Sequence, residues 1–140
     1  MNVRLVVEGQ NQPSLDEHVK RLLDARTKIR EGLYEFIDAL KDAKDQLPHN
    51  TFQNELGSRL GMRKSVLSKW IAIGSSDYLM TKRDQLPPMF SSLYVLTLIE
   101  KKYSQHYGEQ CFRIMDRLIK NGQITHHSER SDLEVILQEI

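Results

Sequence analysis

The sequence predicts an all-α fold of five or six helices, and two observations support this prediction. Apolar residues recur every three or four positions along most of the chain, as they do on the buried face of a helix. Capping residues and glycines separate these periodic segments, as expected at helix ends. Val3, Leu5 and Val7 recur at every second position, which suggests a short N-terminal strand or arm.

Length and composition indicate a single folded domain, residues 1–140, with 39% hydrophobic and 28% charged residues. No apolar run approaches the roughly 20 residues that cross a bilayer, and the N-terminus lacks the apolar core of a secretory signal. The single cysteine, Cys111, excludes an intramolecular disulfide. It fits a reducing cytoplasm, and we expect it to be a small buried hydrophobe.

Residues 14–47 predict a long helix or a helix pair. Ser14 and Glu17 have the spacing of a capping box. Two questions stay open: whether the segment is one helix or two joined near Thr27–Gly32, and whether its apolar stripe packs on its own chain or forms a coiled-coil seam with a second chain. The stripe, interrupted by Arg26, consists of Leu15, Val19, Leu22, Ile29, Leu33, Phe36, Leu40, Ala43 and Leu47.

Residues 51–74 predict two short helices joined by a tight turn at Gly61. Pro48 disfavours helix at Leu47, and Asn50 or Thr51 is expected to cap the first short helix. Gly57 lies inside that helix, where glycine costs about 0.5–1 kcal/mol relative to alanine. We therefore expect a second helix to approach closely at this position.

The second short helix, from about Lys64 to Ile73, has two contrasting faces. Leu67, Trp70, Ile71 and Gly74 share the apolar face, and the opposite face carries Ser65, Ser68, Lys69 and Ala72. No acidic residue occurs from Gly57 to Ser76, and residues 51–83 hold six Lys and Arg against two Asp and Glu. Small side chains and cations suit a helix that enters the DNA major groove.

Residues 86–140 predict the C-terminal helices. We expect a loop at "GSSDYLMTKRDQLPP", a helix from Ser91 or Ser92, and another from about Gln105 to Lys120 that ends at Gly122. "SDLE", Ser131 to Glu134, predicts a capping box for the last helix. The chain stops inside an apolar pattern, so a natural end and the N-terminal part of a longer protein are both open.

"FQNELGSRLGMRKSVLSKWIAIG" resembles the helix-turn-helix of Cro- and repressor-class DNA-binding proteins. The resemblance implies that the site residues Arg63, Lys64, Ser65, Ser68 and Lys69 face bases or nearby phosphates. It also implies that Thr51 and Gln53 lie beside the DNA backbone. From the charge pattern we add Arg59, Lys82 and Arg83 as a phosphate-contacting rim. The family usually has a small polar residue at the position of Arg63.

The flanking segments are similar to DNA-binding proteins of phages and plasmids, including relatives of the ParB and KorB partition proteins. The similarity rests on "REGLYEFIDALKDAKDQLPHNTFQNELGSRLGM" and "QLPPMFSSLYVLTLIEK". It implies a role in the DNA biology of mobile elements: transcriptional regulation, partition or replication initiation.

Nothing in the sequence marks an enzyme, a metal site, a cofactor or a small-molecule ligand. The five histidines form no pair of ligand doublets, and no glycine-rich phosphate loop occurs.

We therefore predict sequence-specific binding to double-stranded DNA without catalysis, in a bacterial cytoplasm and at the nucleoid when bound. One short helix reads few base pairs, so a homodimer on an inverted or direct repeat is expected. The alternatives are a protein–protein adaptor or oligomerisation domain, and the targeting part of a longer enzyme.

Overall fold

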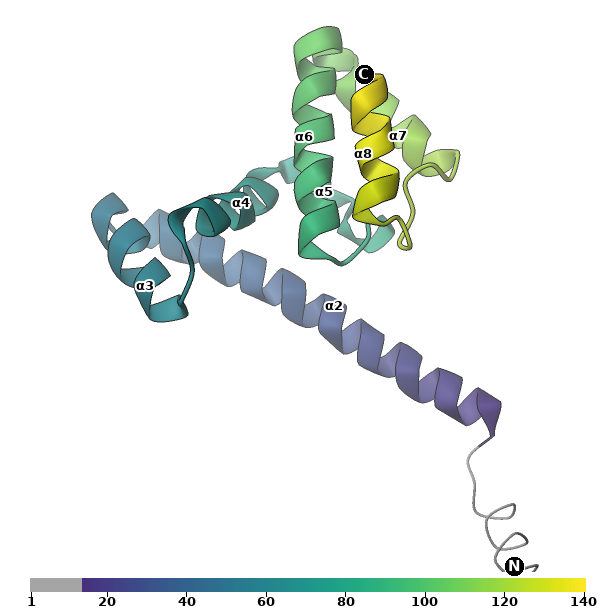
Figure 1. The fold of residues 1–140 in the computed structure, drawn as a ribbon, viewed down its shortest axis with the longest axis horizontal. Helices are drawn as coiled ribbons and strands as arrows, with labels where there is room; N and C mark the ends of the chain where they lie inside the picture. Colours follow the sequence, from purple (N-terminus) through teal and green to yellow (C-terminus); the bar gives the residue numbers. More distant parts are fainter. Residues whose placement is uncertain (1–13) are drawn as a thin grey trace, which may run out of the picture. The chain divides into compact units, whose positions relative to one another are not determined.

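A computed structural model describes residues 14–140 of the chain, and every regular element in this range is helical (Figure 1). The prediction of an all-α fold is therefore confirmed. The predicted N-terminal strand or arm lies outside the described residues. The chain divides into two compact units, one that ends at Gly32 and one that spans Leu33–Ile140, and the predicted short helices all belong to the second.

The first element is a single helix, α2, which spans Leu15–Gln46. The Glu17 backbone N–H donates to the Ser14 hydroxyl at 3.2 Å, so Ser14 caps the helix as predicted. Asp16 and Glu17 lie in the first turn, where negative charge is favourable. The segment is therefore one helix and not two helices joined near Thr27–Gly32.

The segment after Pro48 is helical from His49 onward and differs from the prediction at its start. The Phe52 N–H donates to the Pro48 carbonyl oxygen at 2.9 Å. Asn50 has helical angles, φ −67° and ψ −40°, and makes no side-chain cap bond. The expectation that Asn50 or Thr51 caps this helix is wrong, because the chain turns helical already at the proline. Thr51–Leu56 form a π-helical segment, η1, which continues into α3, Gly57–Leu60.

The predicted glycine turn joins α3 to α4, which spans Lys64–Ser75. Gly61 has φ 69° and ψ 25°, a left-handed conformation that disfavours side chains. The N–H groups of Met62 and Gly61 donate to the carbonyl oxygens of Gly57 and Ser58. These bonds satisfy carbonyl groups at the end of α3 and fix the turn that leads into α4.

The predicted loop after α4 contains two short helices, α5, Asp77–Thr81, and η2, Arg83–Gln85. The Ser76 hydroxyl accepts from the Leu79 N–H at 3.1 Å and donates to Glu100 Oε1 at 2.5 Å. One serine therefore caps α5 and ties it to the next long helix. The sequence interpretation overlooked this cap because the neighbouring polar residues suggested a loop.

The next long helix, α6, spans Phe90–Tyr107 and starts earlier than predicted. Its N-cap is Met89, and no side chain caps it. Ser92 is buried and donates to the Ser128 carbonyl oxygen at 3.3 Å, so it joins two segments rather than starting a helix. The predicted helix start at Gln105 is also wrong, because α6 continues to Tyr107 and the chain breaks at Gly108, φ 57°.

The C-terminal elements are η3, Gly108–Gln110, α7, Cys111–Lys120, and α8, Arg130–Glu139. Gly122 has φ 77° just after α7, as predicted. The capping box of α8 is formed by Glu129 and Asp132 and not by Ser131 and Glu134. The Glu129 N–H donates to Asp132 Oδ2 at 2.9 Å, so α8 begins slightly earlier than the serine suggested.

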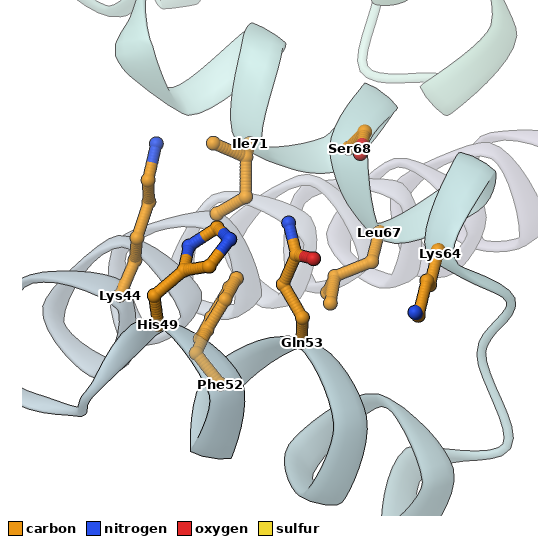
Figure 2. A pocket seen from close by; sticks show the side chains of 8 residues that line it. All are labelled: Lys44, His49, Phe52, Gln53, Lys64, Leu67, Ser68 and Ile71. Atoms are coloured by element: carbon orange, nitrogen blue, oxygen red, sulfur yellow. The ribbon is translucent and has the colours of Figure 1, made fainter.

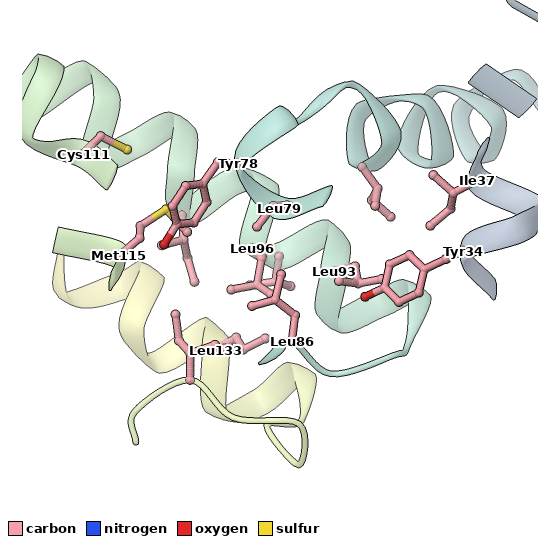
Figure 3. Close-up of a cluster of buried hydrophobic side chains, with 14 residues drawn as sticks. Tyr34, Ile37, Tyr78, Leu79, Leu86, Leu93, Leu96, Cys111, Met115 and Leu133 are labelled. Carbon is pink, nitrogen blue, oxygen red and sulfur yellow. The ribbon is translucent and has the colours of Figure 1, made fainter. Parts of the chain in front are cut away.

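The unit Leu33–Ile140 contains two hydrophobic clusters. The larger lies around α6, which contacts α4, α7 and α8 (Figures 1 and 3). The smaller is built from Leu40, Phe52 and Leu67 beneath α4. Cys111 is buried in the larger cluster, as predicted, and burial raises the pKa of its thiol.

Trp70 packs against both clusters and joins them. Its ring centroid lies 4.9 Å from that of Phe36 and 4.5 Å from that of Phe90. Phe36 belongs to α2 and Phe90 to α6, so one side chain of α4 connects the two elements on either side. The predicted role of Trp70 in the packing of α4 is confirmed, although the ring is only partly buried.

Two helical glycines should respond in opposite directions to the same substitution. A Cβ at Gly57 would lie 3.4 Å from the Met62 carbonyl oxygen and 3.5 Å from Leu67 Cδ2, at the near limit of ordinary contact, whereas a Cβ at Gly74 would lie 2.9 Å from Cγ2 of the buried Ile37. We expect Gly57→Ala to stabilise the protein by about 0.5–1 kcal/mol. We expect Gly74→Ala to destabilise it by about 1–3 kcal/mol through overpacking. Chemical denaturation measures both, and equal effects of the two substitutions would contradict the packing described for α4.

Candidate nucleic-acid interface

Helix α4 has one face buried in the protein and one face open to solvent. Leu67, Ile73 and Gly74 are buried, and Trp70 is half-buried beside them. The opposite face presents Lys64, Ser65, Ser68 and Ser75, all exposed, with Ala72 partly exposed among them. The buried face therefore holds α4 in place, while the exposed face presents a row of short side chains to solvent.

The arrangement around α4 follows from the two clusters and the glycine turn. Leu67 packs with Leu40 of α2 and Phe52 of η1. Gly74 lets the backbone of α4 approach Ile37 of α2. These contacts hold the helix along its length, so the exposed residues are presented by a rigid element, as precise recognition requires.

A hollow of about 160 Å³ lies between α4 and residues 44–53, which form the end of α2 and the start of η1 (Figure 2). Phe52, Leu67 and Ile71 supply its apolar lining. Lys44, His49, Gln53, Lys64 and Ser68 supply its polar lining. Figure 2 shows Gln53 and His49 extending toward α4 between Lys44 and Lys64, so polar groups from α2, η1 and α4 line the hollow.

The residues predicted to contact bases are all on the surface. Arg63, Lys64, Ser65, Ser68 and Lys69 are exposed. Lys69 differs from the others, because its Nζ lies 5.1 Å from the centroid of the Tyr94 ring, a cation–π distance. This contact places the Lys69 ammonium beside α6, at the border of the exposed face of α4.

The residues predicted to contact phosphates fall into two groups. Arg59 is exposed near the end of α3, and Thr51 and Gln53 are half-buried in η1. Lys82 and Arg83, in contrast, form ion pairs with carboxylates: Lys82 with Asp116 at 3.4 Å and Arg83 with Asp38 at 3.3 Å. Their charges are thus partly neutralised within the protein, which weakens the case that they add to the rim.

The sequence interpretation missed Lys44 and His49, which line the hollow with Gln53 and Lys64. Neither residue was assigned to the interface from the sequence. Their relevance depends on the turn at Pro48, which brings the end of α2 next to η1. The sequence signal that could have pointed to them is their position directly before the predicted helix-turn-helix.

Tyr78, beside the candidate interface in sequence, has a structural role. Its hydroxyl donates to Asp116 Oδ1 at 2.6 Å, and its ring stacks on Phe112 with centroids 4.9 Å apart. Burial, reinforced by the hydrogen bond to the Asp116 carboxylate, raises the pKa of the Tyr78 phenol well above its usual range. The phenol stays neutral and links α5 to α7.

Comparisons with protein-family models, with curated proteins and with solved structures found no match for this chain. Within residues 14–140, no group of three or more His, Cys, Asp or Glu side chains is placed to hold a metal ion. None of the helices described for this part of the chain is long and apolar enough to span a membrane.

Proposed function

We propose that the protein binds double-stranded DNA in a sequence-specific manner by placing the exposed face of α4 in the major groove. The observation that carries this proposal is the row of exposed short side chains, Ser65, Ser68 and Ser75, on a helix whose other face is buried. Helix α4 follows a second helix across a tight glycine turn, which is the arrangement of a helix-turn-helix. The proposal covers regulation, partition and replication initiation in a mobile element alike.

The shape of α4 suits the major groove. The groove is about 12 Å wide and admits one α-helix when the side chains that enter it are short. Ser65 and Ser68 let the helix backbone approach the base edges, and their hydroxyls donate to or accept from bases. Lys64 and Arg63 lie at the N-terminal end of the same helix, where recognition helices commonly contact base edges.

The charge around α4 favours a polyanion. No carboxylate occurs between Gly57 and Ser76 in the sequence, so nothing within α3, the turn and α4 repels phosphates. Arg59, Arg63 and Lys64 are exposed there. Lys44, His49 and Gln53 at the hollow add donors that can contact the DNA backbone on one side of the inserted helix.

The proposal is tested by titrating a labelled duplex pool with the full chain at increasing salt. DNA binding predicts an affinity that falls linearly in log–log form, with a slope of about −0.9 for each phosphate neutralised. A protein–protein adaptor with an unused helix-turn-helix predicts no binding at any moderate salt. Absence of binding at about 50 mM salt would thus favour the adaptor and reject the proposal.

We expect Arg63→Ala and Lys69→Ala each to weaken specific binding by roughly 1–3 kcal/mol where the side chain contacts a base. A phosphate contact instead predicts a uniform loss across sequences and a salt slope reduced by about 1. Lys101→Ala, which removes an exposed lysine from α6, is the matched control and should leave affinity unchanged. Unchanged affinity in both variants of the α4 region would remove these residues from the interface.

A further inference from the structure

The first half of α2, in the unit that ends at Gly32, exposes a stripe of large apolar side chains. Leu15 is 78% exposed, Leu22 67% and Ile29 67%, and Val19 and Leu23 are also exposed. The same stripe continues at Leu33, Phe36 and Leu40, but there it packs into the clusters of the second unit. The stripe is thus used within the chain in its second half and left exposed in its first half.

The spacing of the exposed stripe is that of a coiled coil. Leu15, Val19, Leu22, Arg26 and Ile29 are separated by four, three, four and three residues. This 3.5-residue repeat keeps one seam facing a partner helix. Val19 and Arg26 then occupy the a positions of the heptad, and Leu15, Leu22 and Ile29 occupy the d positions.

We propose that residues 15–32 of α2 pair with the same segment of a second copy of this chain, in antiparallel orientation. The inference concerns the free protein and does not depend on DNA binding, although a dimer would present two copies of α4. The two orientations make different predictions for Arg26 and for the residues that flank the seam, and both sets of residues favour the antiparallel pair.

Arg26 is the only charged residue on the exposed seam. In a parallel pair in register, the a positions face each other, so two Arg26 guanidinium groups would meet at the seam, where like charges repel. In an antiparallel pair an a position faces a d position, and the register that centres the segment places Arg26 opposite Leu22. There the guanidinium can extend to solvent while its aliphatic stem covers the leucine.

The flanking e positions are Asp16, Leu23 and Arg30. In the antiparallel register, e positions lie beside e positions, so Asp16 of each copy meets Arg30 of the other and the two Leu23 side chains meet at the centre. A parallel pair sets e against g, which matches Leu23 with His18 and Arg30 with Ala25. It forms no pair of opposite charges, so charge complementarity selects the antiparallel arrangement.

The oligomeric state is measured by sedimentation velocity on the full chain without DNA. The segment is only 18 residues long, about 27 Å of helix, so we expect a dissociation constant in the micromolar range. Leu22→Lys sets a second cation opposite Arg26 and should raise that constant at least about 100-fold, whereas Glu31→Lys, exposed and outside the seam, is the matched control. A monomer at about 1 mM, or a dimer that Leu22→Lys leaves unchanged, would overturn the proposal. Because no DNA is present, neither result bears on the proposed function.

The orientation is measured by cysteine cross-linking with a short bismaleimide, in a Cys111→Ala background. In the antiparallel pair the two Leu23 positions lie side by side, whereas the two Val19 positions are about 15 Å apart along the axis. We therefore expect Leu23→Cys to cross-link and Val19→Cys not to. Cross-linking of Val19→Cys in preference to Leu23→Cys would overturn the antiparallel arrangement. The melting temperature of each variant, unchanged from that of the background, shows that the exposed segment was altered without unfolding the second unit.

Discussion

Replacement of Trp70 by alanine is expected to lower the free energy of unfolding by about 3 kcal/mol. The ring contacts Phe36 on one side and Phe90 on the other and is the one residue of α4 that packs against both hydrophobic clusters. Truncation of a fully buried tryptophan costs about 3–5 kcal/mol, and the partial exposure of Trp70 places it at the lower end. Chemical denaturation, followed by circular dichroism, measures the change.

Tyr107→Ala provides the control for this substitution, because it removes a comparable aromatic ring that is 52% exposed at the end of α6. We expect it to change stability by less than about 0.5 kcal/mol, as for most surface substitutions. A loss below about 1 kcal/mol for Trp70→Ala would show that the ring does not join the two clusters. It would also remove the packing argument for a rigid α4.

Ser68→Glu is expected to reduce the affinity of the protein for a duplex that the wild type binds by at least about 100-fold. Ser68 is exposed in the middle of the outward face of α4 and also lines the hollow beside Gln53. A longer, negatively charged side chain there would hold the helix away from the base edges and set a carboxylate near phosphates, which costs several kcal/mol. Fluorescence anisotropy with the labelled duplex measures the loss.

Ser104→Glu makes the same chemical change at an exposed position of α6 and should leave affinity within about twofold of the wild type. Since Ser68 is exposed, the glutamate should not alter the melting temperature, which separates loss of binding from loss of fold. Equal affinities of the Ser68→Glu and Ser104→Glu proteins would exclude α4 as the recognition element.

The features that the sequence predicted are those that depend on neighbours in the chain. The periodicity of apolar residues after Ser14 indicated helix throughout α2, although not whether it was one helix or two. The left-handed turns at Gly61 and Gly122 were recognisable because glycine adopts positive φ angles without strain. The two faces of α4 were readable from the spacing of Leu67, Trp70 and the serines. All of these signals operate within one or two helical turns.

The wrong predictions of helix starts, ends and caps arose mainly where a polar side chain has more than one possible partner. Ser92 looks like a cap but is buried and bonds to Ser128, which is 36 residues away in sequence. The end of α6 was misplaced because a helix pattern continues on both sides of Gly108. Ser76 caps α5 in a segment whose composition is typical of a loop. Tertiary contacts determine each of these outcomes, and local sequence patterns carry no information about such contacts.

At the candidate interface, too, some features follow from neighbours in the chain and others depend on tertiary contacts. That Ser65, Ser68 and Lys64 face outward follows from helical periodicity. The pairing of Lys82 with Asp116 and of Arg83 with Asp38 depends on α7 and α2, which lie more than 30 residues away in the chain. The grouping of Lys44 and His49 with Gln53 depends on the bend at Pro48 and on the packing of Phe52 beneath α4.

Whether α4 reads DNA sequence is measured by selecting bound duplexes from a random library with the full chain. We expect the wild type to enrich a short motif, and we expect the Ser68→Glu protein to lose enrichment at the base positions that α4 specifies. Retention of duplexes without any enriched motif, or enrichment of the same motif by Ser68→Glu, would contradict the proposal that α4 reads DNA sequence.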